Sequence, residues 1–150
     1  MALAYGAVAN NGFLMKPYIV EAVKMPDGEI IHSSPQVIRR VIEEKTSLSL
    51  KAMLAAVVKE GHGRRAAVSG YTIGGKTGTA QVAKKNAKGY EENATIGSFA
   101  GFGPVENPKF VIVARLDNPK GVIWAESSAA PLFGKIAKFL LDYLQIPKER

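Results

Sequence analysis

The chain has 150 residues, of which 47% are hydrophobic, so it is long and apolar enough for one domain with a core and is not a disordered tail. It contains no cysteine, which excludes disulfides and thiolate metal sites. His32 and His62 lie far apart with no acidic cluster between them, so we expect no metal and no cofactor. The net charge is +7, but the basic residues are scattered and not interleaved with aromatic side chains. We interpret them as a solvated surface and expect no nucleic-acid partner.

The first residues predict a helix that begins without a cap. Met1 is followed at once by the alanine-rich run Ala2–Ala9, and Asn10-Asn11-Gly12 provides a left-handed stop. No stretch is long and apolar enough to span a bilayer, and no charged and apolar leader opens the sequence. A helix that starts in this way suggests a piece of a longer protein.

A hairpin is predicted next. Residues 18–24 and 29–32 form its strands, and Met25-Pro26-Asp27-Gly28 is the turn, because proline presets φ and glycine supplies a positive φ. Residues 37–42 are a short extended piece.

A helix follows, with Thr46 as its predicted cap and Gly61 as its end. Its core-facing side is expected to carry Leu50, Met53, Leu54, Val57 and Val58.

The run from Gly70 to Thr77 supports two incompatible interpretations. Read as Gly-Tyr-Thr-Ile-Gly-Gly-Lys-Thr, it fits G-x-x-x-x-G-K-[ST], the phosphate-binding loop of nucleotide hydrolases. That loop needs a buried strand before it and a helix after it. Residues 63–69 carry two arginines and make a poor buried strand, and Gly78 is unfavourable in a first helical turn. Asp117, at the end of an apolar segment, could hold magnesium, but no crossover helix separates the two segments.

In the second interpretation, Lys76-Thr77-Gly78 is the K-T-G triplet shared by penicillin-binding proteins and class A β-lactamases. It requires residues 71–82 to form one extended strand, which the period-two pattern favours.

The remaining elements predict an antiparallel meander. A charged loop over 84–92 leads to strands over 97–103 and 109–116, joined by the turn 104–108. A last helix begins at Pro131 and stops before Pro147. Its core side is expected to carry Leu132, Ile136, Phe139, Leu140, Tyr143 and Leu144. The predicted fold class is α+β, an antiparallel sheet covered by helices.

These motifs together resemble the C-terminal part of the transpeptidase domain of class B penicillin-binding proteins. The resemblance runs almost end to end, and its most specific parts are K-T-G-T-A-Q, F-x-G-F-x-P followed by N-P, and A-A-P-x-F. In the sequence these parts are Lys76-Thr77-Gly78-Thr79-Ala80-Gln81, Phe99-Ala100-Gly101-Phe102-Gly103-Pro104 with Asn107-Pro108, and Ala129-Ala130-Pro131-Leu132-Phe133. Residues 1–150 would then be the C-terminal portion of one transpeptidase domain.

The resemblance implies an acyl-transfer enzyme. In the family a serine attacks the D-Ala-D-Ala carbonyl of a peptidoglycan stem peptide, D-Ala leaves, and an amine of a neighbouring strand takes the acyl group. No Ser-x-x-Lys and no Ser-x-Asn occurs in this sequence, so both motifs are expected upstream and the chain alone is expected to be inactive. A non-catalytic remnant that binds wall peptide stays open as an alternative.

The resemblance also assigns site residues and surroundings. Lys76 would supply positive charge, the hydroxyls of Thr77 and Thr79 would hold the substrate carboxylate, Gly78 would let the peptide lie close to the strand, and the Thr79 amide would be an oxyanion donor. The implied partners are the stem peptide, β-lactams and other cell-wall synthesis proteins. The implied location is the extracytoplasmic face of the membrane, with an anchor upstream.

Five further residues receive weaker assignments. Gln81 is interpreted as a structural strand residue, His62 as a loop residue, and Trp124 and Tyr143 as packing residues. Glu126 could face the cleft, although the sequence offers no argument for it.

Overall fold

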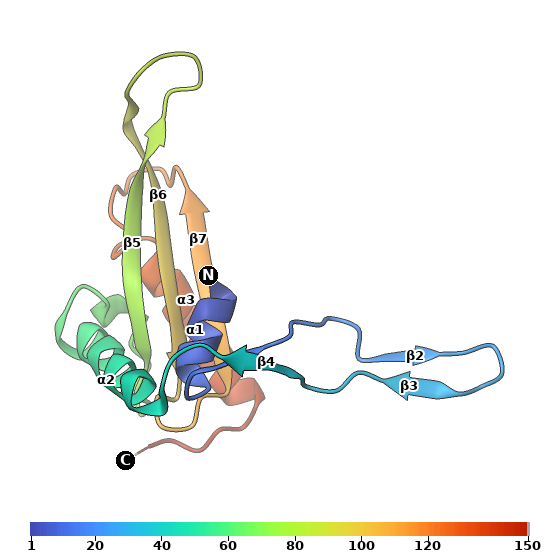
Figure 1. Cartoon of the computed structure of the whole chain (residues 1–150). Coiled ribbons are helices and arrows are strands. Elements are labelled where there is room, and N and C mark those ends of the chain that lie inside the picture. The colour runs from blue at the N-terminus through green and yellow to red at the C-terminus, as the bar shows by residue number, and fades with distance from the viewer. Residues whose placement is uncertain (150) are drawn as a thin grey trace.

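The computed structural model describes residues 1–149, with the side chain of Asn93 left out of the description (Figure 1). It confirms the α+β class with antiparallel strands and covering helices. In chain order the elements are α1 (Ala2–Ala9), β1 (Phe13–Met15), β2 (Ala22–Lys24), β3 (Ile30–His32), β4 (Val37–Arg40), α2 (Glu44–Glu60), the 3-10 helix η1 (Arg64–Ala66), β5 (Gly74–Ala83), β6 (Tyr90–Gly103), β7 (Phe110–Asp117) and α3 (Ala129–Tyr143).

The centre of the molecule is a three-stranded antiparallel sheet in the order β5-β6-β7. Phe99 and Phe102 are three residues apart on β6, so they face opposite sides of the sheet, and both are fully buried. Gly75 makes this packing possible, because a Cβ there would lie 2.5 Å from the Phe99 ring. Small residues on β5 therefore fit against aromatic residues on β6, Gly75 against Phe99 on one face and Gly74 against Phe102 on the other.

The predicted strand over 71–82 is wrong at its start. Gly70 has φ of +86° and the amide of Tyr71 donates to the carbonyl of Val68, so a turn ends only a few residues before β5 begins at Gly74. At the other end the expected loop over 84–92 is shorter, because β6 already starts at Tyr90.

The last helix buries a different side from the one predicted. Phe133, Ala137 and Leu141 are fully buried, whereas Phe139 is 64% and Tyr143 73% exposed. Small residues explain the difference. Ala129, Ala130, Gly134 and Ala137 let the helix approach η1 so closely that a Cβ on Gly134 would lie 3.1 Å from the carbonyl of Arg65. The predicted face was chosen from the large apolar residues, whereas the buried face is the one whose small residues let the helix pack closely on η1. The helix also begins at Ala129, two residues before Pro131.

The second helix also begins and packs differently from the prediction. It starts at Glu44, so Thr46 lies inside the first turn and does not cap it. Its buried residues are Ser47, Lys51 and Val58, while Met53 is 64% exposed. Ser47 and Lys51 are buried where they make polar contacts to α1 and the residues just after it. The hydroxyl of Ser47 donates to the carbonyl of Val8 at 2.6 Å, and Lys51 Nζ donates to Asn11 Oδ1 at 2.7 Å.

Between α1 and α2 the chain extends as an arm, defined here as residues 13–40, which projects far from the sheet (Figure 1). The predicted hairpin is present as β2 and β3, with Val23 opposite Ile31. The first strand is shorter than predicted, starting at Ala22. At the base of the arm β1, which the sequence did not predict, pairs with β4.

Candidate active site

The K-T-G triplet lies on an edge strand. β5 runs from Gly74 to Ala83 and pairs only with β6 within the sheet that the structure describes, so Lys76, Thr77 and Gly78 sit in extended backbone. No helix starts at Thr77 in this part of the chain. The phosphate-loop interpretation of residues 70–77 is therefore wrong, because its amides would have to open a helix.

A cavity of about 380 Å³ lies beside this strand. Thr77 and Thr79 project into it from the same face, as period-two alternation predicts. The opposite wall comes from the segment between β7 and α3 and from the loop after α2. Its lining residues are His62, Thr77, Thr79, Trp124, Ala125 and Glu126.

One hydrogen bond fixes how the Thr79 hydroxyl can act. The amide of Ala125 donates to Thr79 Oγ1 at 3.2 Å. Because that oxygen accepts the amide proton, its own proton is free to be donated to a ligand in the cavity. Ala125 is buried, and Thr95 Oγ1 holds the same segment by donating to the carbonyl of Ile123 at 2.7 Å. Thr79 is thus a preset donor, which suits an acceptor such as a carboxylate.

Lys76 provides positive charge next to these hydroxyls. Its Nζ donates to the carbonyl of Thr77 at 2.9 Å and to Thr77 Oγ1 at 3.2 Å. Among the described residues it makes no ion pair, so its charge is not cancelled by a nearby carboxylate. Gly78 is exposed and has Ser98 against it, since a Cβ there would lie 2.7 Å from Ser98 Oγ, which also donates to the Gly78 carbonyl at 3.2 Å.

Two residues at this cavity escaped the sequence interpretation. His62, expected to be an ordinary loop residue, lies at the cavity with Nδ1 3.1 Å from Glu126 Oε2. Trp124, expected to pack, is 66% exposed and lines the cavity. The two glycines around His62 were the available signal, because a side chain held between glycines is presented by a tight loop. Tyr143 is a surface residue stacked on Phe139, with ring centroids 5.9 Å apart.

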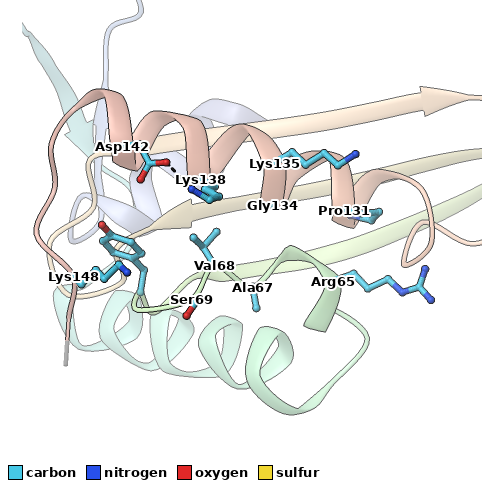
Figure 2. Close-up of a pocket in the computed structure, with 11 residues that line it drawn as sticks. Arg65, Ala67, Val68, Ser69, Pro131, Gly134, Lys135, Lys138, Asp142 and Lys148 are labelled. Atoms are coloured by element: carbon cyan, nitrogen blue, oxygen red, sulfur yellow. Dashed lines mark hydrogen bonds and ion pairs between the residues drawn. The ribbon is translucent and has the colours of Figure 1, made fainter.

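A second cavity, of about 470 Å³, lies on another part of the molecule between η1 and α3 (Figure 2). Figure 2 shows basic side chains along it, among them Arg65, Lys135 and Lys148. Lys138 donates to Asp142 at 2.7 Å, and this hydrogen bond raises the pKa of Lys138. None of its lining residues belongs to β5, so this larger cavity is separate from the K-T-G strand.

Comparison with known proteins identifies the family. Residues 1–138 match the family described as "Penicillin binding protein transpeptidase domain", and the chain belongs to this family. It is 41% identical over 146 residues to the stage V sporulation protein D of Bacillus subtilis, covering 95% of this chain and 22% of that protein. It is 36% identical over 156 residues to the penicillin-binding protein PbpB of Mycolicibacterium smegmatis, covering 98% of this chain and 24% of that protein. The chain therefore spans under a quarter of the length of these relatives.

Solved structures agree with the family and the fold. The chain matches penicillin-binding protein 3 of Mycobacterium tuberculosis, in a complex with ampicillin, with a TM-score of 0.87 and 35% identity, covering 99% of this chain and 35% of that one. The transpeptidase domain of penicillin-binding protein 3 from Burkholderia pseudomallei matches with a TM-score of 0.79 and 31% identity, covering 99% of this chain and 43% of that one. None of the helices described over residues 1–149 has the length and apolar character needed to cross a membrane.

Proposed function

We propose that this chain forms the K-T-G side of the acyl-transfer site of a peptidoglycan D,D-transpeptidase, as the C-terminal portion of one transpeptidase domain in a longer protein. The observation that carries the proposal is the K-T-G edge strand with Thr77 and Thr79 directed into a cavity beside it. Relatives that include a peptidoglycan D,D-transpeptidase FtsI homolog from Mesostigma viride, 29% identical over 98% of this chain, support the reaction class.

The substrate carboxylate binds at the two threonines. The hydroxyl of Thr79 accepts from Ala125 and donates to the carboxylate, and Thr77 donates from the neighbouring position on the same face. Lys76 adds positive charge, and hydrogen bonds to an ionised carboxylate are about twice as strong as those between neutral groups. The absence of a side chain at Gly78 lets the extended peptide lie against the strand.

The reaction then runs as a two-step acyl transfer. The serine of a Ser-x-x-Lys motif, which this sequence lacks, attacks the carbonyl of the D-Ala-D-Ala bond and forms an ester. The proton lost by the serine hydroxyl passes to the leaving nitrogen, and D-Ala departs as an amine. The Thr79 amide stabilises the oxyanion of each tetrahedral intermediate. An amine of a second stem peptide attacks the ester, forms the cross-linking amide and releases the serine. A β-lactam stops the cycle at the ester.

Location and partners follow from the same proposal. Cross-linking takes place on the extracytoplasmic face of the membrane, where the stem peptides are, and the longer protein is anchored there by a segment outside this sequence. Its partners are stem peptides, β-lactams and other cell-wall synthesis proteins.

Covalent labelling with a fluorescent penicillin tests the proposal. The longer protein that carries this chain is expected to retain the label through denaturation, because the ester is covalent. The 150-residue chain alone is expected to stay unlabelled, since it has no Ser-x-x-Lys. A label mapped to a serine within residues 1–150, or no label on the longer protein, would overturn the assignment.

A further inference from the structure

His62 and Glu126 meet at the edge of the K-T-G cavity although they are 64 positions apart. His62 follows α2 and Glu126 lies between β7 and α3, and His62 Nδ1 is 3.1 Å from Glu126 Oε2. Their side chains are 82% and 41% exposed, so this is a solvated pair and not a buried ion pair. Both residues line the cavity that Thr77 and Thr79 also line. A charge on either side chain therefore acts on a ligand in that cavity.

The backbone holds His62 in place. The amides of Gly61 and Gly63 both donate to the carbonyl of Val57, at 3.0 and 3.1 Å. A Cβ at Gly63 would lie 3.0 Å from the same carbonyl oxygen, so the loop folds tightly onto the end of α2. The imidazole is consequently presented from a fixed point at the cavity edge.

The segment that carries Glu126 is equally fixed. Ala125, the preceding residue, is buried and donates from its amide to Thr79 Oγ1. The amide of Ala130 donates to the Ala125 carbonyl at 2.9 Å, and a Cβ on Gly97 would lie 2.6 Å from Ser128 Oγ. The backbone that carries Glu126 is therefore held directly after the residue whose amide donates to the Thr79 hydroxyl.

This arrangement puts a negative charge beside an anion site. Glu126 repels a carboxylate ligand, and a protonated His62 opposes that repulsion. Other charged groups at the end of α2, on η1, on β5 and in the segment before α3 include Lys59, Glu60, Arg64, Arg65, Lys76 and Lys120. Lys59 pairs with Glu60 at 3.8 Å, and Arg64 donates to the Glu60 carbonyl at 2.9 Å. His62 and Glu126 thus line the cavity itself, while Lys76 adds a cation at the Thr77 hydroxyl.

We infer that His62 and Glu126 set the affinity of the K-T-G cavity for anionic ligands, with the imidazolium of His62 favouring and the carboxylate of Glu126 opposing the carboxylate of the acyl donor. The inference rests on the proposed function, because it takes the threonines as the carboxylate site. Both residues act on the ligand through its charge and are positioning residues for the reaction.

The competing explanation is a purely structural clasp. If the pair only holds two loops together, removing either partner loosens the cavity, and both variants slow acylation. If the pair acts through charge, the two variants have opposite signs. That difference makes the inference testable without knowledge of the natural stem peptide.

The test uses the longer protein that carries this chain and its nucleophile. We would measure the second-order rate of acylation by benzylpenicillin, which is anionic, and by its neutral methyl ester, for the wild type, His62→Gln and Glu126→Gln, at pH 6. With benzylpenicillin at pH 6, His62→Gln is expected to lower the rate and Glu126→Gln to raise it, each roughly two- to fivefold. With the neutral methyl ester, both variants are expected to be acylated at the wild-type rate.

The outcomes separate the inference from the proposed function. If the wild type is acylated and both variants change the rate in the same direction, the inference is wrong and the transpeptidase proposal stands. The same holds if neither variant changes the rate with benzylpenicillin. A wild-type protein that benzylpenicillin does not acylate overturns the proposed function itself. Melting temperatures of the two variants are recorded beside that of the exposed control Glu106→Gln. If either variant melts below the control, its rate change is assigned to unfolding and the inference is overturned.

Discussion

The central sheet and the projecting arm contain similar apolar residues, but the sheet buries them and the arm exposes them. Both contain strands with valine, isoleucine or phenylalanine, as in Phe110–Asp117 of the sheet and Ile30–His32 of the arm. In the sheet, Phe99 and Phe102 are fully buried, and Phe133 of α3 packs on Phe99 with ring centroids 4.7 Å apart. In the arm, Ile19 is fully exposed and Ile31 is 52% exposed. Strand propensity is therefore met in both regions, but the hydrophobic core cluster includes residues of the sheet and of α3 and none of the arm.

This difference in burial indicates that the sheet, and not the arm, stabilises the fold and positions the candidate site. The K-T-G strand is held by the same packing that buries Phe99, since Gly75 lies directly against that ring. Positioning of Lys76 and Thr79 therefore depends on the sheet core. The arm contacts neither the cavity beside β5 nor the residues that line it, as judged from the part of the chain described. Substitutions in the two regions should consequently differ in kind.

The largest expected effect is on acylation. In the longer protein, Lys76→Ala should slow penicillin acylation by about 10²–10⁴-fold, because in the proposed site its ammonium would assist charge development and proton transfer. Its folding stability should change by no more than about 0.5 kcal/mol, as expected for an exposed side chain. The matched control is Lys24→Ala in the arm, which should change neither. A lowered melting temperature for Lys76→Ala would make its role structural, and the carboxylate roles of Thr77 and Thr79 would fall with it.

The next effect compares core with arm directly. Phe133→Ala should reduce the free energy of unfolding by about 3–5 kcal/mol, because it opens a cavity against Phe99. Ile31→Ala, in the arm, removes a half-exposed side chain and should cost under about 1 kcal/mol. Urea titration followed by circular dichroism measures both. Equal losses in the two variants would mean that the arm belongs to the same cooperative core as the sheet.

A smaller effect is expected where α1 meets α2. Ser47 is fully buried and its hydroxyl donates to the Val8 carbonyl at 2.6 Å, so Ser47→Ala leaves that acceptor without its partner. The loss should be about 1 kcal/mol. Ser34→Ala, at an exposed arm position, serves as the control and should be neutral. If both variants melt at the wild-type temperature, the α1–α2 contact contributes nothing measurable.

Sequence patterns predicted what depends on neighbours along the chain. The hairpin turn at Gly28, the meander and the extended K-T-G strand follow from turn residues and alternation, and all three are present. The face of α3 did not follow, because burial there depends on how closely Gly134 approaches η1 rather than on side-chain size. The strand over 13–15 was also missed, since three residues carry too little pattern.

The same limit applies to the site. The placement of Thr77 and Thr79 on one face of an extended strand could be predicted from period-two alternation, and both line the cavity. The pairing of His62 with Glu126 could not, because it joins two loops that only the tertiary fold brings together. Nor could the hydrogen bond from Ala125, a residue with no polar side chain, that orients the Thr79 hydroxyl.

The smallest expected effect concerns Lys51, which is 5% exposed and donates to Asn11 at 2.7 Å. Burial lowers the pKa of Lys51, and the attraction of Glu44 offsets only part of that shift. Since the folded pKa lies below the unfolded value, protonation favours the unfolded chain. The stability that this group contributes is complete above the unfolded pKa of about 10.5 and is lost as the pH falls through the folded value.

Lys51→Met removes this dependence and keeps the aliphatic packing, so it should change stability near neutral pH by under about 1.5 kcal/mol. The free energy of unfolding of the wild type minus that of Lys51→Met should fall as the pH is lowered from about 11 to about 8, because only the wild type takes up the proton. Lys45→Met, exposed on the same helix, provides the matched curve for ordinary lysine titration. A difference that stays flat over this range, or that rises as the pH falls, would show that the hydrogen bond to Asn11 outweighs the cost of burying the ammonium.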